Sequence, residues 1–288
     1  MRLRGFLRAL VCIVGINNLY AQAYNYPAMP DSLTNDSVRA EYLAEHFWDN
    51  ADWNDDTLLA KPKVMLDYLY VLRLLPKESA SKSIGQTVQL FDQYPKQYPR
   101  LLFWLERYLH DPRSPYFSDE MFSWVVDAIL QTDVEDEFLD VWLRTRETLG
   151  KNRIGQLAED FTFIDKQGRV GRLYDIETPL LMLIFHKPNC SRCQKTEELI
   201  SRNDTLQRLL ETGKMKILGI CIDSEYEEWM EHTYPENWLC GFDEKGLIEE
   251  DMLYEIRQYP SIYLLDKEKH ILLKEADYEL VQKALLGR

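Results

Sequence analysis

The stretch Pro179-Leu180-Leu181-Met182-Leu183-Ile184-Phe185, followed by His186-Lys187-Pro188-Asn189-Cys190-Ser191-Arg192-Cys193, decides the fold of the second half of the chain. Its continuously apolar first part is typical of a central strand that is buried on both faces. Residues 190–202 then have helical spacing, which predicts that the strand passes through a short loop into a helix. The two cysteines therefore lie where a buried strand gives way to a helix.

The position of this C-x-x-C pair favours redox chemistry. Cys190 stands at the amino end of the predicted helix, where unpaired backbone N–H groups and the helix dipole favour a thiolate. The helical turn holds Cys193 close enough to form a disulfide with Cys190, so that one cysteine attacks and the other resolves. Arg192, between them, adds positive potential near the sulfur atoms. We expect no cofactor and no metal at this site.

Zinc binding is the alternative use of such a pair. A tetrahedral Cys₄ site would have to recruit Cys221 and Cys240 as well. The spacing of these two cysteines is irregular, and both lie in apolar, strand-like runs that suit small buried side chains better than metal ligands.

A second feature supports the redox interpretation. Tyr259-Pro260 directly precedes the predicted strand 261–265. A cis-proline that enters a strand would place the backbone of Tyr259 beside the Cys190 sulfur, where its N–H and C=O can pair with an extended substrate. We therefore predict Tyr259 and Pro260 as substrate-binding residues.

Around these motifs, strands and helices alternate. Further strands are expected at about 160–164, 170–174, 215–222, 238–242, 261–265 and 270–274, and further helices at 225–231, 247–256 and 278–286. Such alternation predicts an α/β domain, residues 151–288, whose sheet is covered by helices on both faces.

Residues 155–288 resemble the thioredoxin-like family, in particular its secreted TlpA/ResA-type branch. The resemblance rests on the entry from Leu157 to Asp165, the turn with Gly168, the motif 189–193 and the late segment 257–266. It implies a thioredoxin fold with a central mixed sheet. It also implies that Cys190 is the nucleophilic thiol, Cys193 the resolving thiol and Pro260 a cis-proline.

The chain departs from that family at the positions that handle protons. Asn189 stands where many relatives have a tryptophan, and Ile184 where thioredoxins bury an acid. Glu197, four residues after Cys193, does not fall where the secreted branch usually keeps its glutamate. The proton acceptor for the resolving thiol is therefore unassigned, and His186, at the strand end, is a candidate.

Residues 24–150 read as helical throughout. Amphipathic helices are expected at 37–50, 62–75, 80–92, 100–110, 118–132 and 134–149. Five of the seven tryptophans of the chain fall here, and they serve either as a packed helical core or as an aromatic groove for a partner. The segment 39–50 is similar to a domain of unknown function that precedes thioredoxin modules in exported Bacteroidetes proteins, which implies no activity.

Residues 1–23 resemble a Sec-type secretory signal. Arg2, Arg4 and Arg8 precede or enter an apolar run, and Ala21-Gln22-Ala23 supplies the small-x-small pattern of a cleavage site. The apolar run is shorter than the ~20 residues of a spanning helix, so we expect no integral membrane segment after cleavage. Cleavage after Ala23 would place the mature protein in the periplasm or otherwise outside the cytoplasm.

Charge and composition limit the partners. The chain of 288 residues has 34 Lys and Arg against 48 Asp and Glu, a net charge of −14, and no basic stripe. Nucleic acid is therefore not expected as a partner. We predict an exported thiol-disulfide oxidoreductase that acts on protein thiols or disulfides together with an unidentified redox partner. The alternative is a non-catalytic binding protein, with a thioredoxin-like scaffold and a helical domain that holds the partner.

Overall fold

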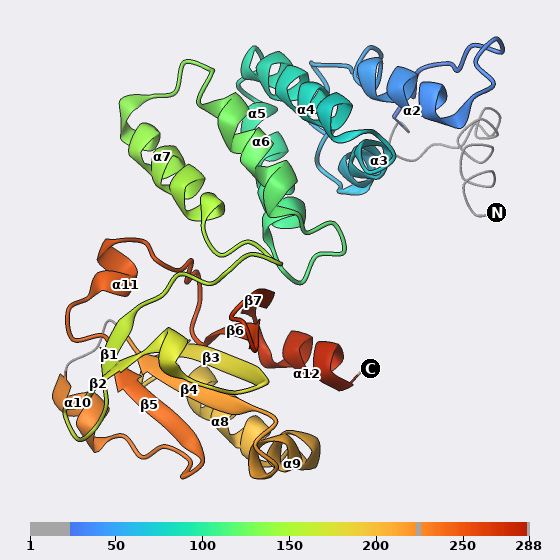
Figure 1. Ribbon diagram of the computed structural model, residues 1–288. Helices are drawn as coiled ribbons and strands as arrows, with labels where there is room; N and C mark the ends of the chain where they lie inside the picture. Colours follow the sequence, from blue (N-terminus) through green and yellow to red (C-terminus); the bar gives the residue numbers. More distant parts are fainter. Residues whose placement is uncertain (1–23, 223–225, 287–288) are drawn as a thin grey trace. The chain divides into compact units, whose positions relative to one another are not determined.

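The computed structural model describes residues 24–222 and 226–286, and Figure 1 shows their arrangement in helices and strands. The chain divides into two compact units, residues 1–139 and 140–288. Most of the helix before Gly150 therefore belongs to the second unit, although the sequence pattern suggested a boundary after residue 150. The expected signal segment, residues 1–23, lies outside the described residues. Among the residues that are described, no helix is long and apolar enough to cross a bilayer.

The first unit is helical, as the sequence predicts. Its elements are α2 (Asp36–Glu45), α3 (Lys63–Leu72), α4 (Lys77–Asp92), α5 (Tyr98–Leu105), the π-helix η1 (Glu106–His110) and α6 (Asp119–Ile129), followed by α7 (Asp136–Gly150), which runs into the second unit.

Aromatic side chains form much of the core of this unit. Phe47, Trp48 and Tyr68 are all buried, and the Trp48 and Tyr68 ring centroids lie 5.3 Å apart. The Trp48 indole N–H donates to the Thr87 hydroxyl over 3.0 Å, so its one polar atom is satisfied inside. These three rings are therefore packing residues, whereas the other four tryptophans of residues 24–150 are partly exposed.

The second unit contains one mixed seven-stranded sheet of order β2-β1-β5-β4-β3-β6-β7. Strands β3, β4 and β5 run parallel to one another, whereas the pairs β1–β2, β1–β5, β3–β6 and β6–β7 are antiparallel. The strands are β1 (Thr162–Ile164), β2 (Val170–Arg172), β3 (Leu180–His186), β4 (Lys216–Cys221), β5 (Trp238–Phe242), β6 (Ser261–Asp266) and β7 (Ile271–Ala276). The helices are η2 (Leu173–Asp175), α8 (Ser191–Ser201), α9 (Asp204–Glu211), α10 (Tyr226–Glu231), α11 (Leu247–Glu250) and α12 (Tyr278–Leu286).

Both faces of the sheet are covered, because successive side chains of the central strand point to opposite sides. Leu183 and Phe185 of β3 belong to a core cluster that includes Ile248 of α11. Met182 and Ile184 belong to a second cluster on the other face, together with Ile200 of α8, Leu206 of α9 and Val281 of α12. The predicted fold class, a thioredoxin-like α/β domain after an all-helical one, is confirmed.

One helix is much shorter than its sequence pattern suggests. The apolar spacing predicted a helix over 247–256, but α11 ends at Glu250, so that prediction was wrong for the second half. Met252 has a φ of 47°, in the left-handed region where a helix cannot continue. An irregular segment then leads from residue 252 to Tyr259.

Candidate active site

The C-x-x-C pair lies at the point where β3 leads into α8. Cys190 is the N-cap of α8, with extended backbone angles, and its Sγ accepts a hydrogen bond from the backbone N–H of Cys193 over 3.2 Å. A sulfur in this position faces the positive end of the helix dipole, which stabilises negative charge on it. The Cys190 side chain is partly exposed, whereas Cys193 is buried, and both are free thiols in the structure. The Cys190 sulfur is therefore accessible to a substrate, whereas the Cys193 sulfur is not.

The segment before β6 approaches the same sulfur. The Tyr259–Pro260 peptide bond is cis, and the Cys190 thiol points to the Tyr259 carbonyl oxygen at 3.9 Å. Beside this contact, the Arg192 guanidinium lies 3.4 Å from the Gln258 side-chain oxygen. Two segments far apart in the sequence thus meet at the predicted site, and they bring together Cys190, Arg192 and Tyr259.

A positive charge lies next to the Tyr259 ring. The Lys187 ammonium group is 4.6 Å from the ring centroid, within the range of a cation–π interaction. Lys187 belongs to the loop between β3 and α8, so this contact ties that loop to the segment before β6. The segment that is predicted to receive a substrate therefore contacts Lys187 of this loop as well as Cys190 and Arg192.

Burial of the second cysteine makes its proton difficult to remove. Burial, followed by its interaction with Cys190, raises the pKa of the Cys193 thiol to about 12. Only a thiolate can attack a disulfide, so Cys193 needs a neighbouring group that accepts its proton. The sequence alone did not identify that group.

Glu197 and His232 form a half-buried acid–imidazole pair near Cys193. The Glu197 Oε1 and His232 Nε2 atoms lie 3.4 Å apart, and the side chains are only 15% and 14% exposed. Glu197 follows Cys193 by one helical turn on α8, and its charge acts on the Cys193 thiol. Burial raises the pKa of Glu197, while His232 opposes that rise.

His186 behaves as a packed neutral histidine. It is buried at the end of β3, and burial, followed by the nearby His232, lowers its pKa to about 3. The His186 and His232 ring centroids are 6.3 Å apart. A group with so low a pKa is a weak base and does not suit the role of proton acceptor. The modulating roles of His186 and Arg192 stay predictions.

The four cysteines of the second unit do not gather at one point. Cys221 on β4 pairs with His186 in the sheet register, and Cys240 on β5 pairs with Gly219. Within residues 24–222 and 226–286, the one set of metal-ligating side chains close enough to share an ion is Asp266, Glu268 and His270, which contains no cysteine. The geometry therefore disfavours the Cys₄ zinc alternative.

One family model matches the N-terminal part of the chain. Residues 11–152 match a family described as a domain of unknown function, DUF5106. No curated protein matches the chain.

Several solved bacterial structures are similar to the chain. A thioredoxin-like protein from Bacteroides caccae has 29% identity over 93% of this chain and 100% of its own, with a TM-score of 0.74. A conserved protein of unknown function from Bacteroides fragilis has 33% identity over 46% of this chain and 98% of its own, with a TM-score of 0.45. A domain of a possible thiol-disulfide isomerase from Cytophaga hutchinsonii has 25% identity over 48% of this chain and 93% of its own, with a TM-score of 0.41.

Proposed function

We propose that the protein is an exported thiol-disulfide oxidoreductase that exchanges disulfides with protein substrates, and its similarity to a solved thioredoxin-like structure supports this. One observation carries the proposal. The partly exposed Cys190 sulfur caps α8, accepts the Cys193 N–H and faces the Tyr259 carbonyl oxygen. A reactive thiol, a resolving thiol and a backbone edge for an extended substrate therefore meet at one place.

The proposed reaction starts from the reduced protein. The Cys190 thiolate attacks one sulfur of a substrate disulfide, and the other substrate sulfur leaves as a thiolate that takes up a proton. Cys193 then loses its proton and attacks the Cys190 sulfur of the mixed disulfide. The second substrate thiol is released, and a Cys190–Cys193 disulfide remains. Two electrons pass from the protein to the substrate, and a redox partner restores them; the same steps in reverse oxidise a substrate.

Glu197 is the proposed acceptor of the Cys193 proton, with His232 as its partner. Burial raises the pKa of Glu197, which makes this carboxylate a better proton acceptor, whereas the raised pKa of Cys193 is the reason that an acceptor is needed. His232 lies at ion-pair distance and can stabilise the ionised carboxylate before the transfer.

Trapping of a mixed disulfide tests the proposal. In a Cys193→Ser variant, the complex between Cys190 and its substrate cannot be resolved, so a covalent adduct should accumulate and disappear on reduction. A Cys190→Ser variant should trap nothing. Cys221→Ser is the matched control, because Cys221 is buried in β4 and takes no part in the proposed reaction. Absence of an adduct with Cys193→Ser, under conditions in which the protein is folded, would argue against exchange.

Export is a separate part of the proposal. It is supported by the basic and apolar pattern of residues 1–23. The intact mass of the protein isolated from the cell envelope should correspond to a chain that begins at Tyr24. A mass that includes Met1 would contradict cleavage after Ala23.

A further inference from the structure

A pocket adjoins the candidate active site and shares Tyr259 with it. It has a volume of about 220 Å³ and is lined by Thr148, Ile222, Glu249, Met252, Tyr254, Glu255, Ile256, Arg257 and Tyr259. Pockets that hold a whole small-molecule ligand usually measure about 300–1,000 Å³. This pocket is therefore of a size to hold one side chain rather than a cofactor.

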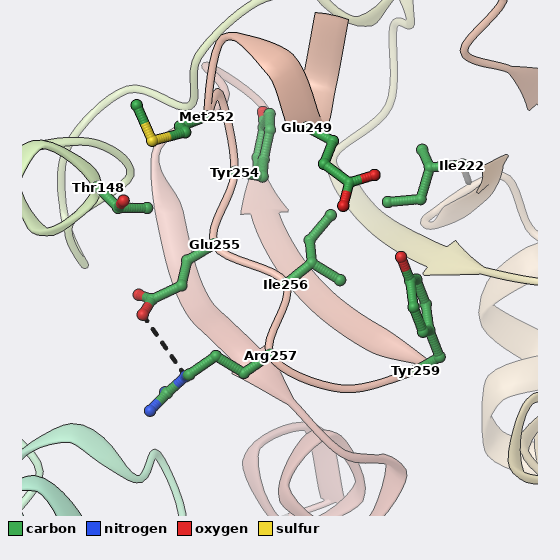
Figure 2. Close-up of a pocket in the computed structure, with 9 residues that line it drawn as sticks. All are labelled: Thr148, Ile222, Glu249, Met252, Tyr254, Glu255, Ile256, Arg257 and Tyr259. Carbon is green, nitrogen blue, oxygen red and sulfur yellow. Dashed lines mark ion pairs between the residues drawn. The ribbon is translucent and has the colours of Figure 1, made fainter. Parts of the chain in front are cut away.

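Its walls combine apolar surface with a carboxylate. Figure 2 shows Glu249, Ile222, Ile256 and Tyr259 gathered on one side of the pocket. Ile222 and Tyr254 are buried and supply apolar surface, and the tyrosine rings add aromatic faces. Such a lining suits a long aliphatic stem that ends in a positive charge, because the stem can pack on apolar groups while the charge meets a carboxylate.

The charges around the pocket are not balanced. Arg257, its one lining cation, is already engaged: its Nε lies 3.5 Å from a Glu255 carboxylate oxygen, and its guanidinium also pairs with Glu275. Among the described residues, none forms an ion pair with Glu249, which is exposed at the end of α11. An incoming cation would therefore find an unpaired carboxylate, whereas an incoming anion would meet an acidic wall.

We propose that this pocket binds a lysine or arginine side chain of the substrate polypeptide, next to the cysteine that reacts with Cys190. The inference rests on the proposed exchange reaction and adds a substrate preference to it. The Tyr259 backbone faces the Cys190 sulfur while its ring lines the pocket. A substrate that lies extended along Tyr259 thus places its reacting sulfur and a neighbouring side chain at the two positions together.

Short synthetic peptides test this preference. Each peptide carries one cysteine as a mixed disulfide with a chromogenic aromatic thiol, in a background of alanine and serine. Lysine is placed in turn at each position around the cysteine, and a matched series carries glutamate instead. The rate of thiol release by the reduced full-length protein is measured. At one position or more, the lysine peptide should react about three- to fivefold faster than its glutamate counterpart, the effect expected of a partly exposed ion pair.

The variant Glu249→Gln tests whether the preference for lysine comes from this pocket or from the net negative charge of the protein. It should reduce the ratio of lysine to glutamate rates at that position to below about twofold, and high salt should act in the same direction. Glu250→Gln is the matched control, because Glu250 is the next residue on α11 and does not line the pocket. Equal rates for all peptides, or an equal loss of preference in both variants, would overturn the inference.

The same peptides with serine in place of cysteine keep the inference testable apart from the reaction. Their binding is measured by fluorescence anisotropy, with the same comparison of lysine, glutamate and the two variants. If no cysteine peptide reacts, the proposed exchange reaction fails, yet tighter binding of the lysine peptide that depends on Glu249 would still support the pocket. If lysine and glutamate peptides bind equally to the unmodified protein, the pocket has no preference for a cation and the proposal is wrong.

Discussion

The variant Glu197→Gln tests whether the carboxylate beside Cys193 acts as a base or only as a charge. Burial raises the pKa of Cys193 to about 12, from an ordinary 9.0. At pH 7 a thiol with that pKa is ionised to about one part in 10⁵, roughly a thousandfold less than an ordinary cysteine thiol. Without a proton acceptor, the resolving step would be slowed by a comparable factor.

The two possible roles of Glu197 predict changes of opposite sign. As a negative charge alone, Glu197 raises the pKa of Cys193, so its neutralisation would increase the thiolate fraction and speed the resolving step. As a general base, its loss should slow that step by about 10²-fold, the lower end of the range for such catalysis. We predict slowing.

Single-turnover kinetics separate the two steps. Reduced protein is mixed with a disulfide substrate, samples are quenched with acid, and mass spectrometry follows the mixed disulfide and the Cys190–Cys193 disulfide. In Glu197→Gln, the mixed disulfide should form at the normal rate and persist. Glu198→Gln is the matched control, since Glu198 is the next residue on α8, is 64% exposed and pairs with Arg202. Resolution in Glu197→Gln that is as fast as in the unmodified protein, or faster, would refute the base assignment.

Three further predictions concern stability and use urea unfolding of the full chain. Burial lowers the pKa of His186 to about 3, so the unfolded chain binds more protons than the folded chain below pH 6.5. The free energy of unfolding should therefore decrease by about 1 kcal/mol for each unit by which the pH is lowered from about 6 to 4. His186→Leu should flatten this slope, and an unchanged slope would contradict the assignment. Gly241→Ala would place a Cβ 2.4 Å from the Phe163 ring and 2.8 Å from the Ile220 side chain, and we expect a loss of about 1–3 kcal/mol; an unshifted midpoint would show that the ring moves freely. At Gly85 in α4 a Cβ meets nothing within 4 Å, so Gly85→Ala should stabilise the helical unit by about 0.5–1 kcal/mol, and destabilisation would reveal a contact.

Much of the fold could be predicted because its strongest signals are local. The apolar run that forms β3 and the change to helical spacing after Cys190 placed both elements to within about a residue. The order of the strands is not local information. Strand β5, for example, pairs with both β4 and β1, and the sequence pattern of each strand only says that it is buried.

Part of the candidate site could also be predicted, because its signals are local. Cys190 and Cys193 are marked by their spacing, and Tyr259 by the proline that follows it. Glu197 had a usable signal, because it lies one helical turn after Cys193, although it does not match the position of the glutamate in the secreted branch. His232 had none, because only the folded chain brings it to α8.

The pocket could not have been found from the sequence. The apolar spacing of residues 247–256 favoured a continuous helix, whereas the left-handed backbone of Met252 opens this segment into the irregular wall that carries Glu255 and Ile256. The pattern of side chains does not show where the helix ends.

Equilibrium titration of the protein in glutathione buffers tests the central claim most directly. The Cys190–Cys193 pair should interconvert between dithiol and disulfide with a potential between roughly −120 and −270 mV, the range of proteins that exchange disulfides. A potential well below about −300 mV would indicate a structural bridge and would contradict the account.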